Sequence, residues 1–195
     1  MPVLTEKRKA RIREVAARRQ KDLTLVLANI HDPHNVSAIL RSCDAFGVGR
    51  VQLYYTVEAF PALGHKASAS ARKWVQTARY VKPGPLCVPL AGEGYQILAA
   101  GFSPKARPLT EFDYTGPTAI ILGNEHRGVD EEFAPYVHGE VYIPMQGMVQ
   151  SLNVSVAAAV ILFEAFRQRD AKGMYDKPSL APEELEALVE RMENT

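Results

Sequence analysis

Short apolar runs alternate along this chain with segments expected to be helical, and this alternation leaves few folds open. The two clearest helical segments are Val36–Phe46, which ends at Gly47, and Leu152–Arg169. Because parallel strands are connected by helices that cover both faces of a sheet, the pattern predicts an α/β fold with a mostly parallel sheet. The runs expected to form strands are Leu23–Leu27, Arg50–Tyr55, Tyr95–Phe102, Thr118–Leu122 and Glu140–Ile143.

The two ends of the chain carry opposite charge. Residues 5–21 contain eight Lys and Arg against two Glu, whereas residues 181–195 contain five Glu against one Arg. With 195 residues, of which 47% are hydrophobic, the chain can bury one substantial core. We therefore expect a basic helical extension over 1–22, one domain over 23–171 and a C-terminal helical extension over 172–195. The basic extension favours a polyanionic partner.

Several classes of protein are disfavoured by the sequence. Cys43 and Cys87 are too few for a disulfide framework or a zinc site, and the histidines lack metal-ligand spacing. The longest nearly apolar run, Val154–Phe163, is half the ~20 residues that a membrane span needs. The N-terminus lacks a secretory signal, and P-loop, G-x-G-x-x-G and G-x-S-x-G motifs are absent. We expect a cytoplasmic protein with no metal and no membrane contact.

Three polar loops follow predicted strands, at Asn29–Asn35, Gly123–Gly128 and Pro144–Asn153. Ligands of parallel sheets bind at the carboxyl ends of the strands, so these loops are candidates for the functional site. The first loop leads to Asn35 and Arg41 on the helix Val36–Phe46. From the residues alone, Asn35 can equally be a helix N-cap, and Arg41 can pair with Asp44 on the surface.

The other two loops also leave alternatives open. Gly123–Gly128 (GNEHRG) can approach a ligand closely with its backbone, or can be an ordinary charged turn. Pro144–Asn153 runs directly into a helix that is apolar on every side, which is typical of a core element. Its polar groups must therefore bond to the rest of the fold or to a ligand. One of Ser151 and Asn153 is expected to cap the helix.

The segments HDPHNVSAILRSCDAFG, LGNEHRGV and IPMQGMVQSLNVSVAAAVILFEAFRQR together resemble the three motifs of the SpoU branch of the SPOUT RNA 2′-O-methyltransferases. The resemblance spans nearly the whole chain and implies a deep trefoil knot over about 95–169. It implies a homodimer whose active site uses both subunits, with the apolar sides of Val36–Phe46 and of the last long helix as interface candidates. It also implies that S-adenosylmethionine is bound at Ala100, Gly123, Ile143 and Leu152.

The same resemblance implies which residues carry the reaction: Asn35, Arg41, Glu125, Ser151 and Asn153. Arg41 would be essential, either as the base or as a guanidinium that binds a phosphate and stabilises the developing alkoxide. Asn35 would orient Arg41 or the ribose, and Glu125 would hold the loops together. Ser151 and Asn153 would shape the cofactor loop.

The implied substrate is tRNA, methylated at the ribose of guanosine 18 in the D-loop. Alternatives are another tRNA or rRNA position, or a non-catalytic RNA-binding protein of the same fold. The 56–73 loop, predicted to be mobile, and Ala100, where relatives often have threonine, depart from the family pattern. The residues expected to contact RNA are Arg8, Arg11, Arg18, Arg19, His34, Lys73, Arg167 and Arg169.

Overall fold

The expected strands form one sheet. The computed structural model describes residues 4–61 and 71–195, and in these ranges seven strands occur in the order β3-β2-β1-β6-β4-β7-β5, with every adjacent pair parallel. The predicted α/β fold with a parallel sheet is confirmed. The strands are β1 (Leu23–Ala28), β2 (Arg50–Tyr54), β3 (Gln76–Tyr80), β4 (Gln96–Ala100), β5 (Arg107–Pro108), β6 (Thr118–Leu122) and β7 (Gly139–Tyr142).

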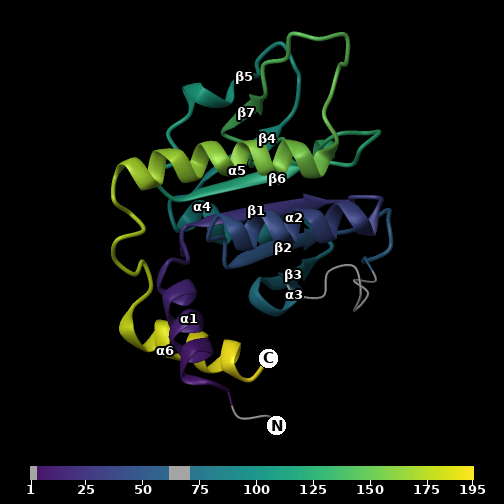
Figure 1. Cartoon of the computed structure of the whole chain (residues 1–195). Coiled ribbons are helices and arrows are strands. Elements are labelled where there is room, and N and C mark those ends of the chain that lie inside the picture. The colour runs from purple at the N-terminus through teal and green to yellow at the C-terminus, as the bar shows by residue number, and fades with distance from the viewer. Residues whose placement is uncertain (1–3, 62–70) are drawn as a thin grey trace.

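Helices cover both faces of this sheet, as predicted. On one face, α2 (Pro33–Ala45) and α5 (Val154–Ala171) lie side by side and share a core with the strands (Figure 1). On the other face, α4 (Gly84–Gly92) and the 3₁₀ helix η2 (Glu131–Phe133) bury a second apolar cluster. β1 and β6 are buried along their whole length, which explains their continuous apolar sequences.

The two terminal extensions pack on each other. Thr5 caps α1 (Glu6–Ala17), and α1 contacts α6 (Pro182–Glu193) through a small cluster of apolar residues separate from the sheet cores (Figure 1). The opposite charges of the two extensions pair directly: Arg13 of α1 bonds Glu186 of α6, and Lys21, which follows α1, bonds Glu184 of α6 at 2.9 Å. The acidic helix therefore neutralises part of the basic extension.

The sequence did not predict several short elements. β3 and β5 are strands at the two edges of the sheet, α4 contains Pro89, and α3 (Ala71–Trp74) has a single turn. A further 3₁₀ turn, η1 (Leu109–Glu111), follows β5. Of the 56–73 segment that we predicted to be a mobile loop, residues 62–70 lie outside the described residues. No helix in the described ranges is both long and apolar enough to cross a membrane.

The two helices proposed as interface candidates differ in what they expose. Most of the apolar side of α2 is buried in the chain's own core, and of its apolar stripe only Phe46, which is half-buried and packs beside Phe163, remains available to an interface. α5 was expected to be a core element on all sides, but Val156 and Phe163 keep 48% and 54% of their surface exposed. A helix of this composition buries one side in a single chain and leaves the other apolar side uncovered.

Candidate active site

The three candidate loops meet at the carboxyl ends of the strands, because β1 and β6 are adjacent and in register. Leu27 of β1 pairs with Leu122 of β6, so the loops that follow them begin side by side. The loop after β7 reaches the same place through the first turn of α5. This is also where the chain order reverses in the sheet, with β2 on one side of β1 and β6 on the other.

Glu125 connects the first two loops. Its carboxylate accepts hydrogen bonds from the side-chain amide of Asn35 at 2.7 Å and from the backbone N–H groups of His31 at 2.9 Å and Asp32 at 3.5 Å. Partial burial alone would raise the pKa of Glu125, but the His31 and Asn35 hydrogen bonds outweigh burial and lower that pKa below its ordinary value. The carboxylate is therefore ionised and fixed in place.

Asn153 adds the third loop to this network. Its Nδ2 donates to Oδ1 of Asn35 at 3.1 Å, while its Oδ1 accepts the N–H of Ser155 at 2.8 Å. Asn153 is thus the N-cap of α5, which confirms that one of the two candidate residues caps the helix. The resulting chain from Asn153 through Asn35 to Glu125 joins all three motifs by side-chain hydrogen bonds.

The structure corrects one alternative for Asn35. The N-cap of α2 is Asp32, whose carboxylate accepts the N–H of His34 at 2.8 Å, and Pro33 occupies the first helical turn. The helix begins earlier than the sequence pattern indicated, because proline is well suited to the first helical position. Asn35 lies inside the first turn, so its amide is available for Glu125 and Asn153.

A cavity of about 440 Å³ lies beside this network. All four predicted cofactor positions line it, together with Glu125, Ser151 and Asn153. Those four positions are Ala100, Gly123, Ile143 and Leu152.

The Gly123–Gly128 loop requires glycine at its first position. A Cβ on Gly123 would lie 2.1 Å from the carbonyl carbon of Gly128, so any larger residue would displace the loop. Asn124 closes the loop by exchanging backbone hydrogen bonds with Gly128, both at 2.9 Å, and its Nδ2 donates to the carbonyl of Asn29 at 2.8 Å. The loop is thus a rigid wall of the cavity that is tied to the end of β1.

Asn29 is a structural residue of this site that sequence reasoning missed. It is fully buried, adopts φ 51° and accepts backbone hydrogen bonds from Thr56, Val57 and Glu58 at 2.9–3.3 Å. Its Nδ2 donates to Asp130 at 2.8 Å. Asparagine tolerates a left-handed backbone, and its position directly after an apolar strand was the available signal. Asn29 fixes the segment after β2 to the motif loops.

Arg41 is the one predicted catalytic residue that neither joins this network nor lines the cavity. It is exposed on α2, does not line the 440 Å³ cavity, and its side chain makes no hydrogen bond or ion pair with any described residue. It lies six residues after Asn35, about 9 Å along the helix and roughly 120° around it. Its expected surface partner, Asp44, instead bonds to Arg19.

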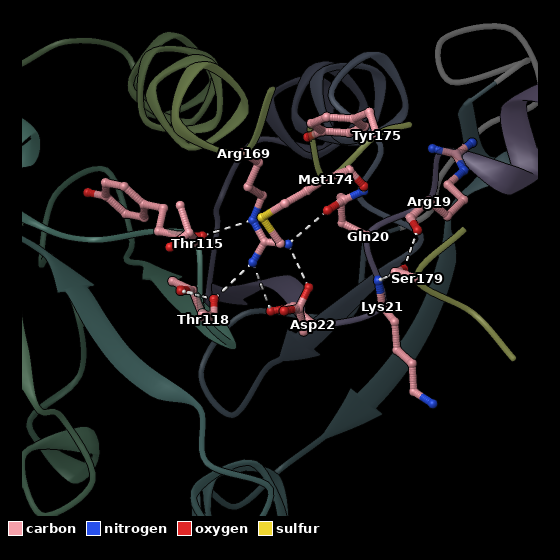
Figure 2. Close-up of polar contacts among 12 residues, drawn as sticks. Arg19, Gln20, Lys21, Asp22, Thr115, Thr118, Arg169, Met174, Tyr175 and Ser179 are labelled. Atoms are coloured by element: carbon pink, nitrogen blue, oxygen red, sulfur yellow. Dashed lines mark hydrogen bonds and ion pairs between the residues drawn. The ribbon is translucent and has the colours of Figure 1, made fainter. Parts of the chain in front are cut away.

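Two residues predicted to contact RNA are buried, and for Arg169 the prediction is wrong because its guanidinium is enclosed by the chain. Arg19 is 2% exposed and forms an ion pair with Asp44. Arg169 is 0% exposed, and Figure 2 shows its guanidinium surrounded by polar groups. It donates to the side chains of Gln20 at 3.0 Å and Asp22 at 2.6 Å. It also donates to the carbonyls of Tyr114 at 2.8 Å and Gly116 at 2.9 Å.

The other six predicted RNA contacts are exposed. Arg167 forms an ion pair with Glu164 at 2.7 Å yet keeps 58% of its side chain exposed. Arg11 and Arg18 both contact Glu14, and Arg8 lies over the Trp74 ring at 5.9 Å. The exposed residues are Arg8, Arg11, Arg18, His34, Lys73 and Arg167.

The sequence and the fold of this chain are similar to those of known RNA methyltransferases. The profile of the SpoU rRNA Methylase family matches residues 22–163. The tRNA (guanosine(18)-2'-O)-methyltransferase of Thermus thermophilus is 48% identical over 179 residues, covering 92% of each chain. The crystal structure of the A. aeolicus TrmH/SpoU tRNA modifying enzyme superposes with a TM-score of 0.90 at 40% identity, covering 97% of this chain and 96% of the other.

A third relative was solved with a cofactor. The AdoMet-bound rRNA methyltransferase from Sinorhizobium meliloti has a TM-score of 0.68 and 25% identity, over 80% of this chain and 59% of its own. The three motif loops and their shared cavity lie within the range of the family match. This chain belongs to the SpoU rRNA methylase family.

Proposed function

We propose that this protein transfers a methyl group from S-adenosylmethionine to the ribose 2′-hydroxyl of guanosine 18 in tRNA. The observation that carries the proposal is the hydrogen-bonded chain Asn153–Asn35–Glu125, which joins the three motif loops beside one cavity. The long, highly identical match to a tRNA (guanosine(18)-2'-O)-methyltransferase supports the choice of substrate. We infer that the protein acts on tRNA in the cytoplasm.

The cavity suits the cofactor in size and lining. Its volume of about 440 Å³ is within the usual range for small-molecule sites. Gly123 and Gly128 line the cavity and present backbone without a side chain there. When bound, S-adenosylmethionine supplies an electrophilic methyl group on a positively charged sulfur, which the ionised Glu125 in the cavity wall favours electrostatically. Ala100, Gly123, Ile143 and Leu152 would hold it.

The residues of the network would position the reactants. Both polar ends of the Asn35 amide are used within the protein, by Glu125 and by Asn153. Asn35 therefore acts by fixing the relation of the loops, so that the attacking hydroxyl and the methyl group are aligned. Ser151 is exposed, lines the cavity and is free to contact the bound cofactor.

Arg41 would complete the site of a second copy of the chain. Within one chain it lies away from the cavity, and α5 leaves an apolar side uncovered at Val156 and Phe163. A homodimer would cover such a surface. In the completed site, the Arg41 guanidinium either binds the adjacent phosphate and stabilises the developing alkoxide, or removes the hydroxyl proton. The six exposed residues predicted to contact RNA would bind tRNA phosphates.

The test is methylation of an unmodified tRNA transcript with labelled S-adenosylmethionine, followed by mapping of the labelled nucleotide. The matched substrate control is the same tRNA with a 2′-deoxyguanosine at position 18. We expect label at guanosine 18 and none in the control. Equal labelling of both RNAs would assign the activity to another position. Labelling of rRNA alone would reject tRNA, and no labelling at all would leave an RNA-binding role.

A further inference from the structure

A second cavity lies at the opposite end of the sheet from the motif loops. Its volume is about 610 Å³, and its lining includes residues of β1, β2 and β3, of α4, and of α6. It lies between the sheet and the C-terminal helix and shares no lining residue with the 440 Å³ cavity. The methyl-transfer reaction proposed above makes no use of it.

The walls of this cavity carry more positive than negative side chains. Lys21 is already paired with Glu184 at 2.9 Å. Glu93 is the other carboxylate of the lining, against three arginines. These are Arg19, Arg50 and Arg191.

Two of these arginines have unsatisfied N–H groups. Arg19 is 2% exposed and bonds Asp44 and the Val48 carbonyl through its terminal nitrogens, but its Nε has no partner among the described residues. Arg191 donates from Nη1 to the Lys73 carbonyl at 3.5 Å, whereas its Nε and Nη2 have none. A buried N–H group without a hydrogen-bond partner destabilises the folded chain.

Water alone would not remove this cost completely. Burial, and then the nearby charge of Arg19, lower the pKa of Arg191, so the two guanidinium groups repel each other. Ordered water could satisfy the N–H groups but would leave the repulsion in place. An anion would satisfy the donors and offset the charge at the same time.

We propose that this cavity binds a phosphate group through Arg19 and Arg191. The guanidinium fork matches phosphate oxygens better than any other side chain does. The remaining wall contains Tyr80, Tyr95 and Leu86, and the cavity is larger than a phosphate ion requires. Apolar and aromatic surface beside a cationic centre suits a nucleotide, either free or as part of an RNA strand.

The direct test is calorimetric titration of the full chain, in phosphate-free buffer, with inorganic phosphate and with guanosine monophosphate. We expect both to bind, the nucleotide more tightly, and Arg191→Gln to weaken binding at least tenfold. The control is Arg107→Gln, which removes an exposed arginine at the far edge of the sheet and should leave the affinity unchanged. No heat from either ligand at millimolar concentration would overturn the proposal, as would equal affinity in Arg191→Gln.

A second variant tests the site while keeping Arg191, in case Arg191→Gln fails to fold. Ala187 is exposed, lines the cavity and precedes Arg191 by four residues on α6, so Ala187→Glu would form an intrahelical pair with it. We expect this variant to lose phosphate binding and to melt at a higher temperature than the natural chain in phosphate-free buffer. Unchanged phosphate affinity in Ala187→Glu would contradict the proposed site.

Competition with tRNA then identifies the source of the phosphate. Displacement of bound guanosine monophosphate by tRNA assigns the site to RNA, whereas persistence of the nucleotide assigns it to a free ligand. Both assignments keep the phosphate site, and neither readout depends on methyl transfer. Failure of this proposal is therefore distinguishable from failure of the proposed function.

Discussion

Arg41 and Arg169 lie on two helices that pack against each other, α2 and α5, yet their surroundings are opposite. Arg169 has no exposed surface, and every nitrogen of its guanidinium donates a hydrogen bond (Figure 2). Arg41 is exposed and bonds none of the described residues. A satisfied, buried arginine stabilises the chain, whereas an exposed arginine without a partner is available to a substrate or a second copy. From residue type and charge alone, the sequence could not show which of the two arginines is buried.

Replacing Arg169 should produce the largest loss of stability. Arg169→Met would leave the Asp22 carboxylate and the carbonyls of Tyr114 and Gly116 without their donor. Removing one partner of such a buried ionic network costs about 3–5 kcal/mol. Chemical denaturation measures this loss, and Arg167→Met is the matched control because that side chain is 58% exposed. Equal unfolding free energies of the two variants would show that the buried arginine stabilises the chain no more than the exposed one.

Replacing Arg41 should affect the reaction and leave stability unchanged. Arg41→Ala is expected to lower kcat for methylation roughly 10²–10³-fold, as for loss of one group that stabilises developing charge. Its unfolding midpoint should stay close to that of the natural chain, because the exposed side chain makes no hydrogen bond or ion pair with the described residues. Arg41→Lys shows whether a positive charge suffices: partial activity would mean that it does, and a loss equal to that of alanine would mean that the guanidinium itself is needed.

Replacing Asn29 should affect both the stability of the chain and its reaction with tRNA. Asn29→Ala would leave three backbone N–H groups and Asp130 without a partner, and would place alanine at φ 51°. We expect a loss of about 1–3 kcal/mol in unfolding free energy. We also expect a raised KM for tRNA, since the segment after β2 is no longer held. Asn29→Gly loses the same hydrogen bonds but adopts the positive φ without strain. The difference between the two variants therefore measures the backbone strain. A KM equal to that of the natural chain in both variants would show that Asn29 has only a structural role.

The smallest expected effect concerns pH. The pKa of Glu125 is lowered in the folded chain, so its contribution to stability is fully present above its ordinary value of about 4.5. That contribution is lost as pH falls through the lower folded value. The difference in unfolding free energy between the natural chain and Glu125→Gln should therefore shrink below pH 4.5. A difference that is constant from pH 3 to pH 7 would contradict the ionised network.

The burial of each element explains which parts of the fold and of the site could be predicted from the sequence. β1 and β6 were found because strands buried on both faces are continuously apolar. β3 was missed because this edge strand exposes polar residues, and α4 because prolines obscure its pattern. The family resemblance identified Glu125 and Asn153, but the burial of Arg19 and Arg169 depends on partners distant in sequence, such as Asp44 and Asp22.

The knot is a further case that local sequence cannot predict. Membership of the family implies a trefoil knot in the C-terminal half of the fold, over about residues 95–169. The strand order agrees with a crossing path, because β7 lies between β4 and β5, whereas β6, which precedes β7 in the sequence, lies on the other side of β4. Such paths are rare, and no periodicity of the sequence encodes them. The knot was therefore predicted from the family resemblance and not from local sequence patterns.

The central claim is that Arg41 of one chain completes the site built by Asn35, Glu125 and Asn153 of another. The direct measurement is methylation by a one-to-one mixture of Arg41→Ala and Asn35→Ala chains after co-refolding. If two chains share each site, mixed dimers contain one intact site, and activity should return to roughly a quarter of the natural level. Each variant alone should stay inactive. If the mixture is as inactive as its components while mixed dimers form, the site lies within one chain and the account is wrong.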